Sequence, residues 1–163
     1  MNNDKRKAPS VTIDGGKAPD FKLQDDSGKT LQLSKLKGRP VVVYFYPKDD
    51  TSGCTAEAKD FSCLAADFRA AGAEIIGISP DGTDSHAKFK SKYDLDLKLA
   101  ADPDKAAALA YGVWVEKSMY GKKYMGVERS TFLIDKTGRI AKSWRKVKVP
   151  GHAEEVLAAV KDF

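Results

Sequence analysis

Cysteine and histidine are scarce in this 163-residue chain, which contains two of each. Two cysteines are too few to build a fold that depends on disulfides, and a chain of this length does not need them. The sequence has no cluster of cysteines and histidines with zinc-site spacing, so we expect no metal centre. The small number of thiols makes the position of each one informative.

Long hydrophobic runs are also missing. The longest, at residues 41–46, is far too short to cross a bilayer. Residues 1–7 carry charge, but the apolar stretch of a secretory signal does not follow them. We therefore expect a cytoplasmic protein with no membrane association. Length and composition suit one domain, which we place at residues 11–163 after a flexible tail over residues 1–10.

Acidic residues are sparse in one region. Residues 117–148 hold ten lysines and arginines against Glu128 and Asp135, while the whole chain carries a net charge of +5. A basic surface can bind nucleic acid or another anionic partner. Exposed aromatic residues are not interleaved with these charges in a nucleic-acid pattern, so we interpret the region as a solvated lysine-rich face.

Segments with strand and helix patterns alternate along the chain. Residues 41–46 form a continuous β-branched and aromatic run, typical of a strand buried on both faces. The predicted strands cover residues 41–46, 73–79, 130–135 and 140–147, with a short N-terminal hairpin from 21–23 and 31–33; the predicted helices cover 54–71, 83–93, 103–111 and 152–161. This order predicts an α/β protein with a thioredoxin-like fold, in which helices flank a mixed central β-sheet.

Cys54 stands where the first of these helices should begin, after a strand and a polar turn. The first turn of a helix has backbone N–H groups without partners and the positive end of the helix dipole. A thiol in such a position loses its proton more easily, and the thiolate is the reactive form. At about 100° per residue, Cys54 lies on the same side of the helix as Phe61, which should face the sheet, whereas Cys63 lies on the opposite side.

Three residues form a pattern at this point, Pro47-x-x-x-Thr51-x-x-Cys54. Cys54 supplies the sulfur, and Thr51 can place beside it a hydroxyl that binds an oxygen substrate. Pro47 has no N–H group and a fixed φ, so it can shield the pocket from water. A nearby guanidinium would stabilise the thiolate and polarise a leaving oxygen. The pattern favours nucleophilic chemistry at a single sulfur.

The segment YFYPKDDTSGCTAE, residues 44–57, resembles the active-site segment of the peroxiredoxins. The resemblance is strongest to the Q type, also called the bacterioferritin comigratory protein branch, and it runs from about Gly15 to the C-terminus. Further segments match that branch in the same order, at residues 18–21, 77–79, 85–89, 111–114, 121–126 and 128–135.

This resemblance implies a thiol-dependent peroxidase that reduces hydrogen peroxide and organic hydroperoxides through a sulfenic acid on Cys54. It implies that Thr51 hydrogen-bonds the peroxide, that Pro47 shields the sulfur, and that Arg129 positions thiolate and peroxide. The chemistry requires no haem, metal or other cofactor. An external thiol from thioredoxin, glutaredoxin or glutathione would reduce the sulfenic acid. Members of the Q type are often monomeric, so we expect a monomer.

The sequence departs from the Q-type pattern at the resolving cysteine. The two positions where members carry this cysteine are Lys59 and Lys90 here. Cys63 lies nine residues after Cys54, about 13.5 Å along an intact helix, whereas a disulfide needs Cα atoms within roughly 7 Å. Cys63 is therefore an inert helix thiol, a resolving thiol after partial unfolding, or a partner in an intermolecular bond, and we favour a one-cysteine cycle.

Two other functions compete with this interpretation. A dithiol–disulfide oxidoreductase of thioredoxin type needs Cys-x-x-Cys, and Thr51 occupies the position of its second sulfur. A basic-surface binding or holdase protein would use residues 117–148, and its affinity for nucleic acid would survive removal of the Cys54 sulfur. Both are weaker than the peroxidase interpretation.

Several other residues are expected to have structural roles. We expect Glu57 to be a first-turn carboxylate that interacts favourably with the helix dipole. Trp114 and Trp144 are expected to be packing residues. His86 and His152 are expected on the surface, without a role in the chemistry.

Overall fold

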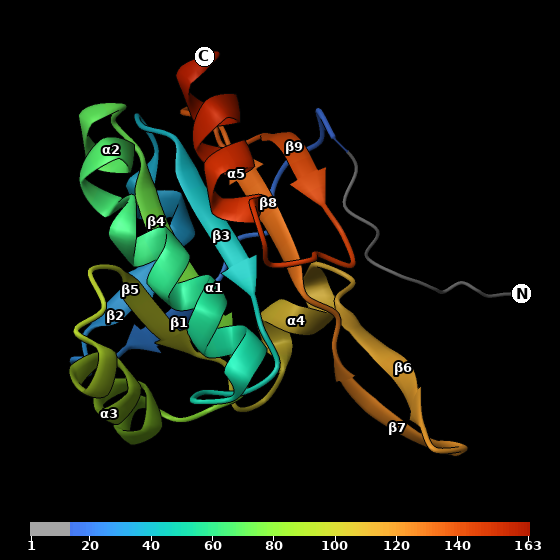
Figure 1. Cartoon of the computed structure of the whole chain (residues 1–163). Helices are drawn as coiled ribbons and strands as arrows, with labels where there is room; N and C mark the ends of the chain where they lie inside the picture. Colours follow the sequence, from blue (N-terminus) through green and yellow to red (C-terminus); the bar gives the residue numbers. More distant parts are fainter. Residues whose placement is uncertain (1–13) are drawn as a thin grey trace, which may run out of the picture.

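The computed structural model describes residues 14–163 (Figure 1). The tail predicted over residues 1–10 lies outside this range, as does the beginning of the domain predicted over 11–163. The described chain contains a seven-stranded mixed sheet in the order β2-β1-β5-β4-β3-β8-β9. Its strands are β1 (Lys22–Asp25), β2 (Thr30–Gln32), β3 (Val41–Phe45), β4 (Glu74–Ser79), β5 (Lys98–Ala101), β8 (Ser130–Ile134) and β9 (Ile140–Trp144).

Within residues 14–163, helices cover both faces of this sheet. They are α1 (Ser52–Cys63), α2 (Ala65–Ala70), α3 (Thr83–Tyr93), α4 (Ala106–Ala110), α5 (His152–Lys161) and the 3-10 helix η1 (Leu33–Leu36). Helices α1, α2, α3 and α5 share one buried cluster with the sheet, and Figure 1 shows α1 and α5 lying across it. Helix α4 packs in a second cluster on the other face. None of these helices is long and apolar enough to span a membrane.

Strand β3 lies inside the sheet, between β4 and β8, and all of its residues are apolar or aromatic and buried. Its side chains alternate between the faces: Val43 and Phe45 pack in the α4 cluster, whereas Val42 and Tyr44 pack in the α1 cluster. The strand pairs in parallel with β4 and antiparallel with β8. The Tyr44 ring stacks on Phe61 of α1 with ring centroids 4.7 Å apart. This contact holds α1 over the strand and positions the first turn of the helix beyond the strand end.

The helix predicted over 54–71 is two helices in the structure. It begins earlier, at Ser52, and is interrupted at Leu64, where φ is −97° and ψ is 5°. The sequence has neither glycine nor proline at this point, so periodicity alone misses the interruption. Phe61 is buried on the sheet side, as predicted, and Phe68 is buried in the same cluster.

The helix predicted over 103–111 is shorter in the structure, where α4 covers Ala106–Ala110. Residues 103–105 form a turn, and Lys105 has a left-handed conformation with φ of 60°. Asp102 still caps the helix, because its carboxylate accepts the N–H groups of Ala107 and Ala108 at 3.2 and 2.9 Å. The other predicted elements are present with small shifts at their ends.

A second, two-stranded sheet is an element that the sequence patterns do not reveal. Strands β6 (Trp114–Met119) and β7 (Lys122–Val127) form an antiparallel hairpin that extends away from the rest of the chain (Figure 1). Tyr120 and Gly121 make its turn, both with positive φ. Polar and apolar side chains are mixed on both faces of this hairpin, so the alternation typical of a half-buried strand does not occur.

Both histidines are buried, so the prediction that they lie on the surface is wrong. His86 is 0% exposed, and its ring nitrogens contact the Asp49 carboxylate at 2.8 Å and the Ala100 carbonyl at 3.0 Å. His152 contacts the Thr131 hydroxyl at 2.8 Å. A histidine can be buried when its polar atoms find partners. Those partners lie far along the chain, so local sequence does not show them.

Candidate active site

Cys54 is the third residue of α1 and lies beyond the C-terminal end of β3. The helix begins after Thr51, so the sulfur is in the first turn, as predicted, near backbone N–H groups without helical partners. Cys54 is 1% exposed and belongs to the buried cluster that contains Tyr44 and Tyr46. Because the surroundings exclude bulk water, charges and dipoles close to the sulfur act on it strongly.

Arg129 brings a positive charge to this sulfur. It lies in the short connection between β7 and β8, and its Nη2 donates a hydrogen bond to Cys54 Sγ at 3.3 Å. Its Nη1 donates to Glu57 Oε1 at 2.6 Å. Burial opposes the positive charge, but the negative charges of Glu57 and Cys54 outweigh this effect and raise the pKa of Arg129. The guanidinium is therefore a permanent cation with two partners.

Gly53 permits the close approach of this guanidinium. A Cβ atom at position 53 would lie 3.2 Å from Arg129 Nη2, which is shorter than an ordinary van der Waals contact. The guanidinium has little freedom to move away, because its bonds to Glu57 and Cys54 fix both of its outer nitrogens. The glycine thus allows the helix N-terminus and the cation to act on the same sulfur.

Glu57 is a site residue, and the prediction that it is a first-turn carboxylate is wrong. The first turn of α1 has no acidic residue, and the Glu57 side chain is 1% exposed and pairs with Arg129. Its second oxygen, Oε2, is buried without a hydrogen-bond partner among residues 14–163. Burial raises the pKa of Glu57 to about 7, and attraction to Arg129 offsets only part of this effect. The sequence feature that could have placed Glu57 in the site is its spacing of three residues from Cys54, which puts both side chains on one side of a helix.

Thr51 and Pro47 lie on the loop before α1. Thr51 is the N-cap residue and is exposed, and its hydroxyl donates to the Lys48 carbonyl at 2.8 Å instead of capping the helix. Because this bond uses the hydroxyl proton, Thr51 Oγ1 can only accept a hydrogen bond from a bound molecule. Pro47 is half-buried after the end of β3. The structure thus brings both residues to the same end of the sheet as the sulfur.

Buried hydrogen bonds tie this loop to α3. The Asp49 carboxylate accepts bonds from the hydroxyls of Tyr46 at 2.6 Å and Ser85 at 2.8 Å, and it contacts His86 Nδ1 at 2.8 Å. The backbone N–H of Asp49 donates to the Asp81 carboxylate at 2.8 Å. The network fixes the loop that carries the motif, which was not evident from the sequence.

Cys63 does not contribute to this site. It is the last residue of α1 and is exposed, whereas Cys54 near the other end of the helix is buried. The two positions where Q-type members carry a resolving cysteine hold lysines with other contacts. Lys59 Nζ lies 5.6 Å from the centroid of the Tyr93 ring, and Lys90 forms a 3.1 Å ion pair with a carboxylate from the loop after β1. Neither position therefore offers a thiol, and Cys63 lies at the far end of α1 from Cys54.

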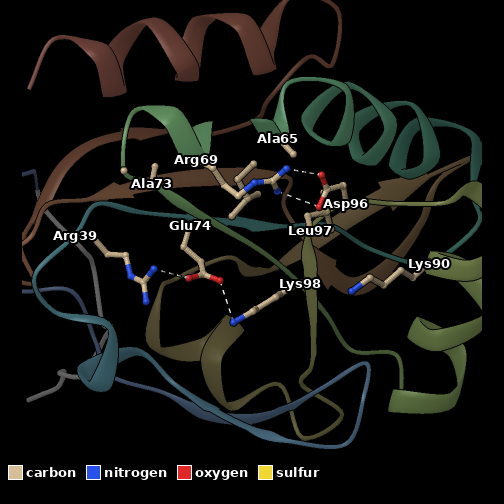
Figure 2. A pocket seen from close by; sticks show the side chains of 11 residues that line it. Arg39, Ala65, Arg69, Ala73, Glu74, Lys90, Asp96, Leu97 and Lys98 are labelled. Atoms are coloured by element: carbon tan, nitrogen blue, oxygen red, sulfur yellow. Dashed lines mark hydrogen bonds and ion pairs between the residues drawn. The ribbon is translucent and has the colours of Figure 1, made fainter. Parts of the chain in front are cut away.

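A cavity of about 660 Å³ lies away from the sulfur, at the N-terminal end of β4 (Figure 2). Figure 2 shows Glu74 between Arg39 and Lys98, which it contacts at 3.5 and 2.9 Å. Arg69 pairs with Asp96 at 2.8 Å. These charged groups are engaged in ion pairs with one another, and neither cysteine lines the cavity. It offers no chemistry that involves a thiol.

Comparison with known proteins defines the family to which this chain belongs. Residues 15–143 match the AhpC/TSA family model, and the chain belongs to this family, whose peroxiredoxin members are thiol-dependent peroxidases. Within the family, the chain is of the Bcp, or peroxiredoxin Q, type. The peroxiredoxin Bcp of Bacillus subtilis (strain 168) is 52% identical over 154 residues, which cover 94% of this chain and 98% of the relative.

Solved structures agree with this assignment. Peroxiredoxin Q of Xanthomonas campestris matches with a TM-score of 0.84 and 46% identity over 87% of this chain and 90% of its own. PrxQ of Xylella fastidiosa matches with a TM-score of 0.89 and 38% identity over 94% and 98% of the two chains. The bacterioferritin comigratory protein of X. campestris, 45% identical with a TM-score of 0.84 over the same shares of 87% and 90%, has been studied for alkyl peroxide reduction. These likenesses confirm the predicted thioredoxin-like fold and the peroxidase class.

Proposed function

We propose that Cys54 is the nucleophile with which this peroxidase attacks hydroperoxides. The observation that carries the proposal is the 3.3 Å contact between Arg129 Nη2 and Cys54 Sγ in the first turn of α1. The thiolate attacks the near oxygen of ROOH in line with the O–O bond. That bond breaks, the sulfur becomes a sulfenic acid, and the far oxygen leaves as alkoxide or hydroxide and takes a proton from water.

The negative charge that grows on the leaving oxygen needs positive or donating partners. Arg129 and the free N–H groups at the start of α1, including that of Gly53, can stabilise this charge. Thr51 Oγ1 accepts a hydrogen bond from the O–H group of the incoming hydroperoxide and orients it. Glu57 holds the guanidinium in place, and Pro47 limits the access of water to the sulfur. The proposal thus gives each residue a separate physical task.

The cycle proposed here uses one cysteine. Because Cys63 is nine helical residues from Cys54, an external thiol reduces the sulfenic acid, and thioredoxin, glutaredoxin and glutathione are the candidates. The alkyl peroxide reduction studied in the X. campestris relative supports organic hydroperoxides, beside hydrogen peroxide, as substrates. A monomeric state and a cytoplasmic location stay predictions from the sequence.

Peroxide consumption by the wild type, Cys54→Ser and Cys63→Ser, with each of the three reductants in turn, tests this mechanism. We expect Cys54→Ser to lose turnover with every reductant and Cys63→Ser to keep it. After one equivalent of peroxide in the presence of dimedone, which traps sulfenic acids, mass spectrometry should find a dimedone adduct on Cys54. Turnover by Cys54→Ser would refute the nucleophile, and a stoichiometric Cys54–Cys63 disulfide in the monomer would refute the one-cysteine cycle.

A further inference from the structure

The β6–β7 hairpin carries exposed apolar side chains that the peroxidase chemistry does not use. Met119 and Tyr124 lie on one face of the hairpin and Tyr120 lies at its turn, and they are 56%, 44% and 98% exposed; we call these three residues the hairpin surface, whereas Met125 lies on the opposite face. Figure 1 shows that the hairpin extends away from the body of the molecule. A two-stranded ribbon is marginally stable by itself, and grouped apolar side chains in water mark interaction surfaces. The hairpin therefore has the character of a contact surface.

One face of the hairpin borders the active site. Strand β7 ends two residues before Arg129, so the base of the hairpin leads directly to the guanidinium. Lys117 lies opposite Tyr124 on the same face and packs over Gly126, where a Cβ atom would lie 3.3 Å from the lysine Cδ. Burial lowers the pKa of Lys117, and the charge of Arg129 lowers it further. Lys117 and Tyr124 therefore share one face of the hairpin, whose base leads to Arg129.

The charge on this side of the molecule is positive. The hairpin has three lysines against Glu116, and the loop at residues 145–148 joins the same region, because the Val147 N–H donates to the Arg129 carbonyl at 2.9 Å. Two copies of the chain facing each other here would bring like charges together. An acidic partner with an apolar patch complements the surface. The basic residues are Lys117, Lys122, Lys123, Arg145, Lys146 and Lys148.

A partner is required by the proposed one-cysteine cycle, on which this inference rests. A thiol that reaches the oxidised Cys54 must cover the surface around Arg129, and the hairpin stands beside that surface. We propose that the hairpin surface is the docking site for a reducing protein whose reactive dithiol is surrounded by apolar and acidic side chains. A small-molecule thiol such as dithiothreitol would not contact the outer part of the hairpin.

The docked partner reduces the Cys54 sulfenic acid in two successive nucleophilic steps. The first partner thiolate attacks the sulfur of the Cys54 sulfenic acid, forms a mixed disulfide, and releases hydroxide, which is protonated to water. The second partner thiol then attacks the partner sulfur of that mixed disulfide and releases the Cys54 thiolate. The sulfenic acid is reduced, and the partner dithiol is oxidised to a disulfide.

The test uses the full chain with three substitutions, Met119→Thr, Tyr120→Asn and Tyr124→Thr. Threonine suits a strand, and asparagine tolerates the left-handed backbone of Tyr120, whose φ is 53°, so the hairpin should keep its fold. Phe163→Ser, which changes an exposed apolar residue at the C-terminus, is the matched control. Each protein is assayed with a bacterial thioredoxin, with a glutaredoxin and with dithiothreitol, and the rate at which peroxide oxidises Cys54 is measured separately.

We expect the triple variant to lose at least about tenfold in kcat/KM for the better of the two protein reductants, since interface anchors of this type contribute most of the binding. Turnover with dithiothreitol and the rate of Cys54 oxidation should stay within about twofold of the wild type, because neither needs a docked protein. Wild-type kcat/KM with that reductant should fall as salt is added.

Other outcomes would overturn the docking site. An unchanged kcat/KM with both proteins, or an equal loss with dithiothreitol, would show that the hairpin surface does not bind the reductant. Loss of dimerisation in sedimentation velocity, or loss of binding to anionic vesicles, without a change in kcat/KM would assign the surface to a second copy or to a membrane. If wild-type Cys54 is not oxidised by peroxide at all, the proposed function fails, and that result is distinct from the others.

Discussion

At the scale of single residues, the site depends on one guanidinium that binds two acidic side chains. Arg129 donates to Glu57 at 2.6 Å and to Cys54 at 3.3 Å. The hydrogen bond to Glu57 is the shorter of the two, so Glu57 sets the position of the guanidinium. That position in turn fixes the length of the hydrogen bond from Arg129 to the Cys54 sulfur. Small changes around Arg129 should therefore affect the rate of the peroxide step more than they affect the fold.

Gly53→Ala tests this dependence. The added methyl group would lie 3.2 Å from Arg129 Nη2 and push the guanidinium from the sulfur. We expect the second-order rate of Cys54 oxidation to fall roughly tenfold, which corresponds to about 1.4 kcal/mol of transition-state stabilisation. Stability in urea should not fall, because alanine is the better helix former by up to about 1 kcal/mol. Ser52→Ala, at the exposed neighbouring position, is the control, and an unchanged oxidation rate in Gly53→Ala would contradict the prediction.

Glu57→Gln tests the buried carboxyl group. In the folded protein the pKa of Glu57 is raised to about 7 from an ordinary value of 4.5, so the folded state holds this proton more tightly than the unfolded state. Its contribution to stability is therefore complete below the unfolded pKa and is lost as the pH rises through 7. Relative to Glu57→Gln, the wild type should lose up to about 3 kcal/mol of unfolding free energy between about pH 5 and pH 8. Denaturant titrations at several pH values measure this, and parallel curves for the two proteins would contradict it.

At the scale of elements, the loop before α1 is held from outside the helix that it starts. Asp49 collects bonds from Tyr46, Ser85 and His86, so the loop is attached to β3 and α3 at once. This attachment positions Thr51 and the first turn of α1 without any contribution from the Thr51 side chain to capping. Strand, loop and helix α3 therefore form one unit around the sulfur.

Asp49→Ala should break that unit. It removes the carboxylate partner of Tyr46, Ser85 and His86, of which Tyr46 and His86 are buried, and we expect it to cost on the order of 3 kcal/mol of unfolding free energy, measured by urea denaturation. Asp50→Asn is the control. Asp50 also accepts two hydrogen bonds, from Lys92 and Tyr93, but it is exposed, so its loss should cost less than about 1 kcal/mol. Equal effects of the two substitutions would argue against a special role for the buried network.

At the scale of the whole molecule, the Cys54 thiol is buried and the Cys63 thiol is exposed at the far end of the same helix. The chain has no third cysteine. In the cycle that we propose, the lifetime of a sulfenic acid on Cys54 depends on the concentration of an external reductant.

Overoxidation follows from this arrangement. At about millimolar peroxide without a reductant, we expect a second peroxide to convert the Cys54 sulfenic acid to sulfinic acid, with loss of activity that dithiothreitol does not restore. Mass spectrometry of the peptide that contains Cys54 measures this product. The same treatment with excess thioredoxin or dithiothreitol present from the start is the control. Full recovery of the untreated activity after peroxide alone would contradict the prediction.

The sequence by itself determined the local features of this protein. The apolar run of β3 predicts a buried central strand, the spacing of Cys54 and Phe61 predicts their common side of α1, and the motif around Cys54 indicates the family. These features depend on residues close together in the chain, where periodicity and backbone chemistry decide the outcome.

Only the tertiary structure decided how distant residues meet. Arg129 reaches Cys54 across 75 positions and Glu57 across 72, and the burial of His86 depends on Asp49, 37 positions away. Such pairs depend on the order of strands in the sheet, which local patterns do not encode. The resemblance supplied Arg129, but the burial of Glu57, the interruption of the first helix and the projecting hairpin became evident only when all the elements were packed together, because burial is a property of the assembled surfaces.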